Sequence, residues 1–410
     1  MKTFARAAGF VLLVAALFVG CGGEEAQVVD TETGDEPQFE GLTDIQYESW
    51  EVGQTGGRII IPSLGDPKTF NNTVADETST TDITERLFTP IVRRNQFTLE
   101  WEPALAESWE ISDDEKTITY TLREGLLWSD GEPITSSDFV DAVNDIYYNE
   151  AIAGAGSIRN SLNGAGGPSV WEVIDERTFS VTLPNVYAGI FGLTTVSPLP
   201  MHVIRPFIEQ EGAEAFDSFW GVDTDVTSVV SSGPFVVSEY RPGQRVVLER
   251  NPNYFEADAD GNRLPYVDEV VFQIIADQDT MLQNFIAGDI NFLPLRGEDY
   301  GVLVDRQEEL NFELYNVGAS TSTNFIAFNQ NPIEGEGDGG LAEPELTWLQ
   351  NKTFRQAMAH LVDRQTIINN IAFGFGYPQY SFVPRISPYY WDGADEAALK
   401  YDPQQASELL

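Results

Sequence analysis

The chain has 410 residues, of which 42% are apolar and 21% are charged, so it can bury one large core or about two to three smaller ones and is not a disordered protein. Its 65 Asp and Glu against 23 Lys and Arg leave a formal net charge of −42, which repels nucleic-acid backbones and anionic lipid surfaces. One Cys and two His exclude an internal disulfide and the usual zinc, copper and haem sites, so we expect no cofactor and no metal.

Residues 1–20 are typical of a secretory signal peptide. Lys2 and Arg6 form a positively charged N-terminal region, and residues 7–20 form an uncharged run that is too short to span a bilayer. A small residue, Gly20, stands directly before Cys21, the only cysteine of the chain. This arrangement resembles the lipobox of bacterial lipoproteins, which implies that Cys21 is acylated and becomes the mature N-terminus. Ordinary secretion, with Cys21 removed or left free, is the alternative.

Residues 21–56 are acidic and polar, with several glycines and no sustained hydrophobic periodicity. This composition is typical of a flexible tether. A tether between a lipid anchor and a folded body suits a protein that must reach something at the membrane. No later stretch is long and apolar enough to span a bilayer.

The folded body is expected to begin at Gly57. Residues 58–62 form a β-branched run bounded by Gly and Pro, which predicts a buried strand, and residues 116–123 alternate apolar side chains with threonines, which predicts a strand with one buried face. Thr135 and Asp138 fit the capping box of a helix whose apolar stripe continues to residues 146–147. Residues 179–183 alternate in the same way as residues 116–123 and predict another strand.

The later part of the chain mixes further strands and helices. Phe354, Ala357, Met358 and Leu361 have helical spacing, and Asp363 is placed to cap a second helix that begins near Thr366. A mixed order of strands and helices predicts an α/β or α+β protein of more than one lobe. The additional strands are expected at 235–239, 246–250, 270–275 and 325–329.

Motifs of catalysis are missing from the sequence. It has no Gly-x-Ser-x-Gly elbow and no Gly-rich phosphate loop, and His360 lies beside an apolar helical stripe, where a structural role is expected. Acidic residues 113–115 predict a turn. Residues 256–261 resemble a calcium loop, but Val267 stands where such a loop needs a bidentate Glu, so a turn is expected there too. The spread of acidic residues predicts a solvated acidic surface, which a saline habitat would favour.

Five motifs in a fixed order resemble the family 5 solute-binding proteins of ABC transporters, which include the oligopeptide- and dipeptide-binding proteins. The longest runs from Pro-Ala-Leu-Ala-Glu-Ser-Trp to Leu-Trp-Ser-Asp-Gly-Glu-Pro. The resemblance covers roughly residues 57–410, far more than a single motif would. The motifs are residues 103–133, 232–235, 248–254, 264–270 and 354–364.

The resemblance implies an α/β fold of the periplasmic-binding-protein-like type II class, with two large lobes and an extra small lobe. Ligand is expected in the cleft between the large lobes, which close over it. Residues 401–410 resemble a helix that leads, in the family, into the rest of the second lobe, so the fold is expected to be incomplete at the C-terminus. The expected lobes are residues 57–87 with 185–273, a small lobe at 88–184, and an incomplete second large lobe at 274–410.

The same resemblance suggests where ligand is met. The loop of Leu64, Gly65 and Asp66 follows the first strand at a place where family members approach ligand. By rough alignment, Pro294 with Leu295 and Thr323 with Asn324 also face the cleft. Turn chemistry is the alternative for each of these residues.

The implied function is that of a monomeric, extracytoplasmic lipoprotein, in the periplasm or at the cell surface, that serves an ABC importer. It would capture peptides and deliver them to the permease and ATPase subunits, without catalysis and without a nucleic-acid partner. The alternative is the same scaffold binding an oligosaccharide or another small solute, because Trp and Tyr are plentiful and stack on sugar rings. A secreted hydrolase that uses a carboxylate pair is the remote alternative.

Overall fold

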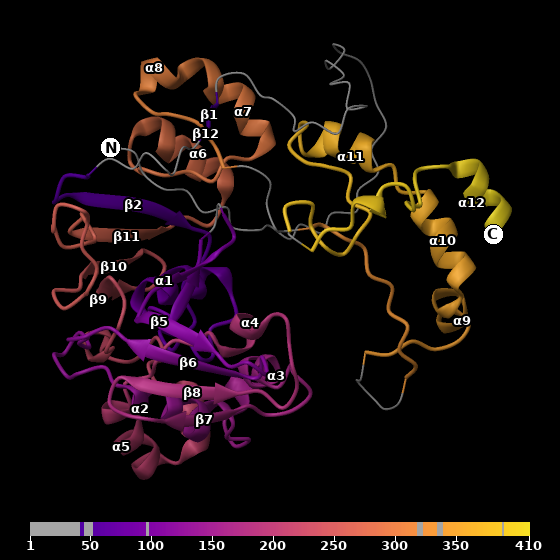
Figure 1. Cartoon of the computed structure of the whole chain (residues 1–410). Coiled ribbons are helices and arrows are strands. Elements are labelled where there is room, and N and C mark those ends of the chain that lie inside the picture. Colours follow the sequence, from indigo (N-terminus) through magenta and orange to yellow (C-terminus); the bar gives the residue numbers. More distant parts are fainter. Residues whose placement is uncertain (1–41, 45–51, 96–97, 318–322, 334–338, 388) are drawn as a thin grey trace. The chain divides into compact units, whose positions relative to one another are not determined.

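The computed structural model describes residues 42–44, 52–95, 98–317, 323–333, 339–387 and 389–410 (Figure 1). The described chain forms two compact units. The first unit contains residues 52–293, and the second contains residues 294–410 together with 42–44. The predicted signal peptide and Cys21 lie outside the described residues.

One four-stranded sheet of the first unit joins the beginning of the body to a much later segment. Its strand order is β2-β11-β10-β9, and β2 is parallel to β11 while the other neighbours are antiparallel. All four strands were predicted from short apolar runs and are confirmed. They are β2 (Arg58–Ser63), β9 (Phe235–Arg241), β10 (Arg245–Arg250) and β11 (Glu269–Ile274).

A second four-stranded sheet is antiparallel throughout, in the order β5-β6-β8-β7. The alternation predicted for β6 and β8 is confirmed, since Tyr120 and Phe179 are buried while their neighbouring threonines are partly exposed. The ring of Phe179 stacks on Phe139 and Trp171 at centroid distances of 5.1 and 5.8 Å, so aromatic packing fills this core. The strands are β5 (Ala106–Ile111), β6 (Thr117–Leu122), β7 (Val170–Val173) and β8 (Thr178–Thr182), and a separate hairpin is formed by β3 (Val92–Arg94) and β4 (Trp101–Pro103).

The predicted capping box begins α2 (Ser136–Asp141), because the Thr135 backbone N–H donates to Asp138 Oδ2 at 2.8 Å. The helix then widens into a π-helical turn at Ala142–Tyr147, which keeps the predicted stripe buried. The other helices of the first unit are α1 (Thr78–Leu87), α3 (Gly156–Leu162), α4 (Ile190–Thr194), α5 (Met201–Glu211) and α6 (Gln278–Ala287), with 3₁₀ turns at Ala153–Ala155, Ala213–Ser218 and Val226–Ser228.

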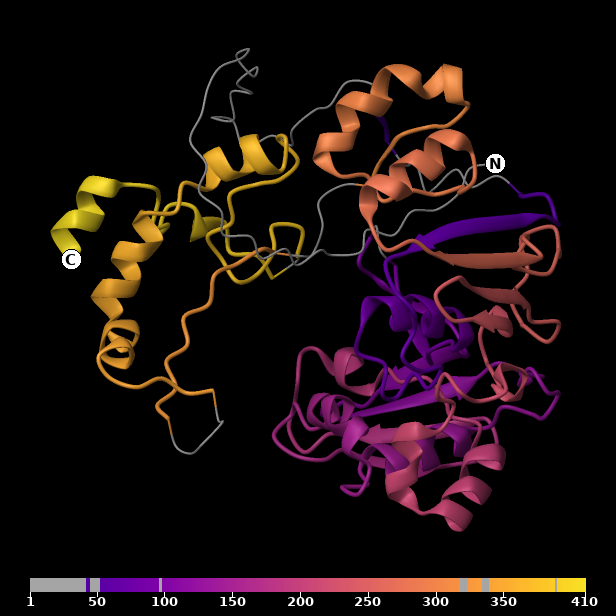
Figure 2. The same ribbon diagram turned by 180° about the vertical axis from the view of Figure 1, so that it is seen from behind.

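The second unit is mainly helical in its described part. Both predicted helices are present, as α10 (Lys352–His360) and α11 (Arg364–Ile371), and the Asp363 carboxylate caps α11 by accepting from the Thr366 N–H at 3.0 Å. Helix α12 (Pro403–Leu409) packs beside α10 (Figures 1 and 2). The remaining elements are α7 (Gly297–Leu303), α8 (Gln307–Leu310) and α9 (Glu345–Gln350), 3₁₀ turns at Val304–Arg306 and Asp392–Ala394, and the parallel pair β1 (Thr43–Asp44) and β12 (Tyr315–Asn316).

Residues 325–329 do not form the predicted strand, and this prediction is wrong. The sequence pattern is local, whereas a strand exists only where a second backbone pairs with it. Within the part of the chain that the structure describes, no backbone group of residues 323–329 has a backbone hydrogen-bond partner.

Parts of the predicted tether are bound to the folded body. The Thr43 N–H donates to the Leu314 carbonyl at 2.7 Å, and the Gly56 N–H donates to the Tyr266 carbonyl at 2.7 Å. These contacts involve too few residues to leave a periodic signal in the sequence. None of the helices in the described part of the chain is both long and apolar enough to cross a membrane.

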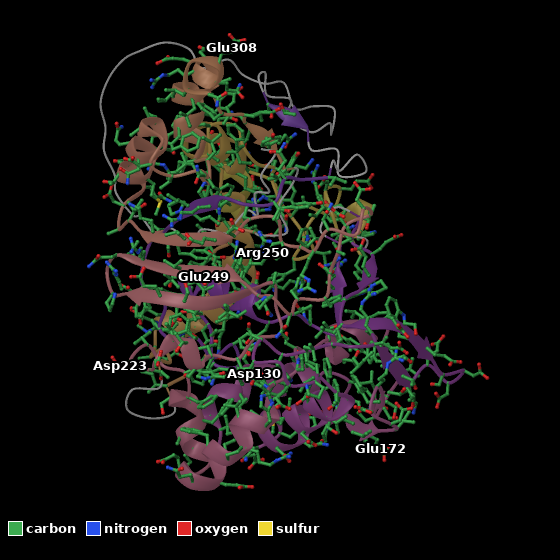
Figure 3. All side chains as sticks on the ribbon, turned by 90° about the vertical axis from the view of Figure 1, so that its left-hand side faces the viewer. Asp130, Glu172, Asp223, Glu249, Arg250 and Glu308 are labelled. Carbon is green, nitrogen blue, oxygen red and sulfur yellow. The ribbon has the colours of Figure 1, made fainter. Side chains whose placement is uncertain are left out.

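Acidic side chains are spread over the described surface. Figure 3 shows the labelled Glu172, Asp223 and Glu308 pointing outward from three separate parts of the chain. Most arginine and lysine ion pairs are at least partly exposed, for example Arg205 with Asp141 and Asp145, so each contributes little. The net charge of −42 therefore leaves a large uncompensated self-repulsion in the folded state.

We predict that salt stabilises the protein. Going from about 0.01 M to about 1 M KCl shortens the Debye length from about 30 to about 3 Å, which screens repulsion between the carboxylates. The midpoint of thermal unfolding should rise with KCl and should change less in sucrose of matched osmolality. An unchanged or lower midpoint in KCl would contradict a stability limited by like charges.

Candidate ligand-binding residues

The loop after β2 presents one side chain and one stretch of open backbone. Leu64 is 41% exposed, and a Cβ placed on Gly65 would meet nothing within 4 Å. The Ser63 hydroxyl donates to the Gly65 carbonyl at 2.9 Å and holds the turn. Leu64 and the Gly65 backbone are therefore accessible to a bound molecule.

Asp66 points into the folded body instead. Its Oδ1 accepts hydrogen bonds from the Tyr240 hydroxyl at 3.0 Å and from the Gly243 N–H at 2.8 Å, and its carbonyl accepts from the Ser79 hydroxyl at 3.1 Å. Burial, together with the hydrogen bond to this carboxylate, raises the pKa of Tyr240 to about 12. Asp66 thus fixes the β9–β10 hairpin and the start of α1 to the loop.

Pro294 and Leu295 lead into α7 of the second unit. Pro294 is exposed and Leu295 is partly buried. The next residue, Arg296, makes a bidentate ion pair with the nearly buried Asp299, with both N–O distances at 2.7 Å. This pair holds the backbone that follows Leu295 in one conformation.

Thr323 and Asn324 lie next to a loop that the sequence did not indicate. The Gln379 side-chain amide donates to Thr323 Oγ1 and to the Ser381 carbonyl, both at 2.9 Å. Asn324 is exposed. Gln379 is therefore a further candidate for this local surface, and only the polar and aromatic content of residues 377–382 could have drawn attention to it.

The predicted residues thus form local groups in two different units. Leu64, Gly65 and Asp66 belong to the first unit, whereas the pairs at 294–295 and 323–324 belong to the second. The structure brings Thr323 together with Gln379 and ties Asp66 to a hairpin. A role in ligand binding stays a prediction for all seven residues.

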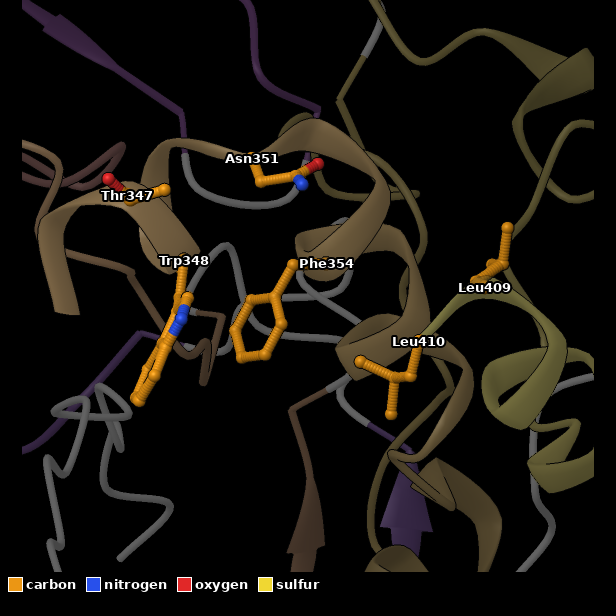
Figure 4. Close-up of a pocket in the computed structure, with 6 residues that line it drawn as sticks. All are labelled: Thr347, Trp348, Asn351, Phe354, Leu409 and Leu410. Carbon is orange, nitrogen blue, oxygen red and sulfur yellow. The ribbon is translucent and has the colours of Figure 1, made fainter. Parts of the chain in front are cut away.

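Two hollows lie away from these residues. One, of about 440 Å³, lies among α9, α10 and α12 and is mostly apolar; Figure 4 shows the rings of Trp348 and Phe354 side by side, with Leu410 beyond them. The Asn351 side chain at its rim caps α10 by accepting from the Thr353 N–H at 2.9 Å. The other, of about 410 Å³, lies between the π-helical turn and α5, where Arg205 bridges Asp141 and Asp145 at 2.9 Å. Neither arrangement pairs a nucleophile with a base.

Titratable groups that drew attention in the sequence have structural partners. His360 is buried and its Nδ1 donates to the Lys400 carbonyl at 2.6 Å, in line with the structural role expected for it. Both predicted acidic turns are confirmed: Asp114 accepts from the Ser112 hydroxyl at 2.6 Å, and Asp258 accepts from the Asn262 side chain at 2.9 Å. No cluster of three or more His, Cys, Asp or Glu within the described ranges is arranged to hold a metal ion.

Known proteins resemble this chain over most of its length. Residues 100–410 match the family model for the middle part of bacterial extracellular solute-binding proteins, family 5. A probable ABC transporter-binding protein of Deinococcus radiodurans is 30% identical over 366 residues, which is 87% of this chain and 59% of the relative. The oligopeptide-binding protein AppA of Bacillus subtilis is 25% identical over 362 residues, with the same shares. The chain therefore spans 59% of the length of both relatives.

A solved structure resembles the fold. The periplasmic binding protein MelB of Agrobacterium fabrum, in complex with stachyose, has a TM-score of 0.67 at 22% identity. The similarity covers 87% of this chain and 55% of that protein.

We predict that Asp66→Ala destabilises the first unit by about 1–2 kcal/mol, because the Tyr240 hydroxyl and the Gly243 N–H both lose a charged acceptor. Urea unfolding of the variant gives the loss. Leu64→Ala in the same loop is the matched control, and as an exposed substitution it should stay within about 0.5 kcal/mol. Equal stability of both variants and the unsubstituted protein would show that Asp66 does not hold the hairpin.

Proposed function

Because this chain belongs to the bacterial extracellular solute-binding proteins of family 5, we propose that it is the receptor of an ABC importer that captures peptides outside the cytoplasm. In this proposal it delivers them to permease and ATPase subunits and catalyses no reaction. The match over residues 100–410 is the observation that carries the proposal. The α/β fold of the periplasmic-binding-protein type II class, expected from the sequence, is confirmed by similarity to solved structures.

Peptide is the favoured cargo for two reasons. The Bacillus subtilis relative is named as an oligopeptide-binding protein. The loop after β2 offers open backbone at Gly65, and recognition through backbone groups suits peptides of varied sequence. Leu64, Gly65 and Asp66, Pro294 and Leu295, and Thr323 and Asn324 are proposed to lie near the ligand, with Asp66 acting through the position of the loop.

An oligosaccharide or another small solute is the second candidate. The fold alone does not select the cargo, since the similarly folded MelB was solved with stachyose. Exposed aromatic rings near Asn324, those of Phe325 and Phe382, are of the kind that stack on sugars. The remote hydrolase gains no support, because the acidic segments that suggested it form turns.

The lobe boundaries and the anchor are part of the proposal. The proposed first large lobe comprises 57–87 and 185–273, the small lobe 88–184 and the second large lobe 274–410. The sheet β5-β6-β8-β7 falls within the range of the small lobe, and the sheet β2-β11-β10-β9 falls within the two ranges of the first large lobe except for Ile274, the last residue of β11. Acylated Cys21 is proposed to attach the protein to the membrane in the periplasm or at the cell surface.

We predict that a peptide, and not an oligosaccharide, stabilises the protein without its signal peptide. A ligand at about 100 times its Kd adds about 2.7 kcal/mol, which a thermal-shift screen of mixed peptides against mixed oligosaccharides detects. Asn324→Ala should weaken the shift, whereas Glu172→Ala, on the exposed part of β7, should not. A shift with oligosaccharides alone would favour the second candidate, and a shift with neither class would count against both.

We predict that Cys21 carries the lipid. Cells fed labelled palmitate should incorporate label into the protein and retain it in the membrane fraction, and Cys21→Ser should abolish both, because the chain has no other thiol. Secretion of the unsubstituted protein without label would favour ordinary export. That result would leave the proposed cargo unaffected.

A further inference from the structure

The edge strand β7 carries exposed apolar side chains. It is the last strand in the order β5-β6-β8-β7, and no further strand of the described chain lies beside it. Val170 is 54% exposed, Val173 is 44% exposed, and the next residue, Ile174, is 58% exposed. Among the large apolar side chains that the structure describes in the first unit, Ile174 is the most exposed. An edge of this kind is a template for another strand.

The backbone of β7 offers hydrogen-bonding groups on its open side. The Ile174 N–H donates to the Thr178 carbonyl at 2.9 Å, so the backbone groups of Ile174 point toward β8. In an antiparallel ladder this direction alternates from residue to residue, and the β7–β8 register therefore directs the groups of Glu172 toward β8 as well. The N–H and C=O groups of Trp171 and Val173 point outward. Within the described ranges these outward groups have no backbone hydrogen-bond partner in another segment.

This edge is complementary to a second copy of itself. When two copies of β7 run antiparallel about a twofold axis at Glu172, Trp171 of one copy lies opposite Val173 of the other. The outward groups of these two residues then meet in hydrogen-bonded pairs on both sides of the axis. On the exposed face, Val170 lies opposite Ile174 of the other copy, so the exposed apolar side chains cover each other. The same five residues thus supply both sides of a closed interface between two copies.

Charge decides when the two edges meet. Glu172 is the only charged residue of 170–174, and it points outward in Figure 3. In the paired edges it lies opposite its own copy, and like charges directly opposite each other destabilise a strand pair. Each chain also has a net charge of −42, so repulsion opposes the approach of two copies until salt screens it. A basic partner would instead bind this edge best in low salt.

We propose that β7 is a self-pairing edge, and that at high salt two copies of the chain join through it. The four strands of the sheet β5-β6-β8-β7 from each copy then form one continuous sheet. At low ionic strength the chain stays a monomer, because Glu172 and the net charge keep the edges apart. Glu172 sets the salt concentration at which pairing begins. The pairing uses none of the candidate ligand-binding residues, so it does not depend on the proposed cargo.

Sedimentation equilibrium tests the proposal. The measured mass should rise from one chain toward two between about 0.01 M and about 1 M KCl, as the Debye length falls from about 30 to about 3 Å. Glu172→Gln should lower the dissociation constant of the dimer by about two- to fivefold, which is the range that one cross-strand side-chain pair supplies. Glu308→Gln, which removes the same charge from the exposed surface of the second unit, should not lower it beyond its effect on net charge. A mass that stays at one chain in high KCl, association that is favoured by low salt, or growth beyond two copies would each overturn the proposal.

Disulfide cross-linking tests the register. A Cys21→Ser background has no thiol, and Glu172→Cys in it should join two copies in high KCl with oxidised glutathione. The reason is that a non-hydrogen-bonded pair brings two Cα atoms to about 4.5 Å, within disulfide range. Val170→Cys alone should not cross-link, because its two copies lie about 13 Å apart along the strands. A mixture of Val170→Cys and Ile174→Cys chains should.

The cross-link also separates this edge from other apolar surfaces. Association through the exposed side chains of the second unit, such as Ile371 at 73%, would raise the mass without joining the two Glu172→Cys chains. That outcome would overturn the proposal, as would cross-linking of Val170→Cys alone that equals that of Glu172→Cys. Thermal midpoints at low salt should be alike for all of these chains, because the substituted side chains are exposed there.

Discussion

Pairing between strands that are distant in sequence is the constraint on which the first unit depends. Strand β2 lies parallel to β11, and Arg58 forms an ion pair with Glu269, which is 211 positions further along the chain. The Asp268 N–H donates to the Gly57 carbonyl at 2.9 Å, and the Gly57 N–H donates back to the Asp268 carboxylate at 3.0 Å. Parallel strands need a crossover connection. Here the connection from β2 to β11 contains all four strands of the sheet β5-β6-β8-β7. The position of the loop at residues 64–66 follows from this pairing.

Aromatic packing stabilises the core of the second sheet, and surface carboxylates stabilise turns. The rings of Phe139, Trp171 and Phe179 stack in the core of the second sheet, and Tyr120 adds a hydrogen bond from its hydroxyl to Thr194 at 2.7 Å. Apart from the buried Asp138 and Asp299, most carboxylates lie at the surface, where turns such as those at Asp114 and Asp258 use them to accept hydrogen bonds from backbone and side-chain donors. The pKa values of both carboxyl groups are lowered mainly by side-chain hydrogen bonds, from Ser112 and Asn262 respectively. The acidic composition therefore supports turns as well as solubility.

Local periodicity predicted part of the regular structure, namely β2, β6, β8 to β11, α2, α10 and α11, but not the other strands and helices. The alternation of β6 and β8 and the capping residues Thr135 and Asp363 are contained in short stretches of sequence, and the structure has all of them. The prediction at 325–329 was wrong because a short apolar run shows only that a segment is able to pair, not that a second backbone lies beside it. Among the candidate site residues, Asp66 was singled out by family resemblance as part of the loop after the first strand, but its partner Gly243 lies 177 positions away and no local pattern shows it. Gln379 was missed for the same reason, since its contact with Thr323 spans 56 positions.

The pairing of β1 with β12 also decides how mechanical load enters the protein. A chain fastened at Cys21 reaches Thr43 and Asp44, and through them the second unit, before it reaches Gly57 and the first unit. If Cys21 is lipidated as proposed, tension on the tether would fall first on this two-residue ladder, next to which the Thr43 N–H donates to the Leu314 carbonyl at 2.7 Å. So short a ladder would break under a small force, and its release would lengthen the tether by freeing Thr43 and Asp44 from the second unit.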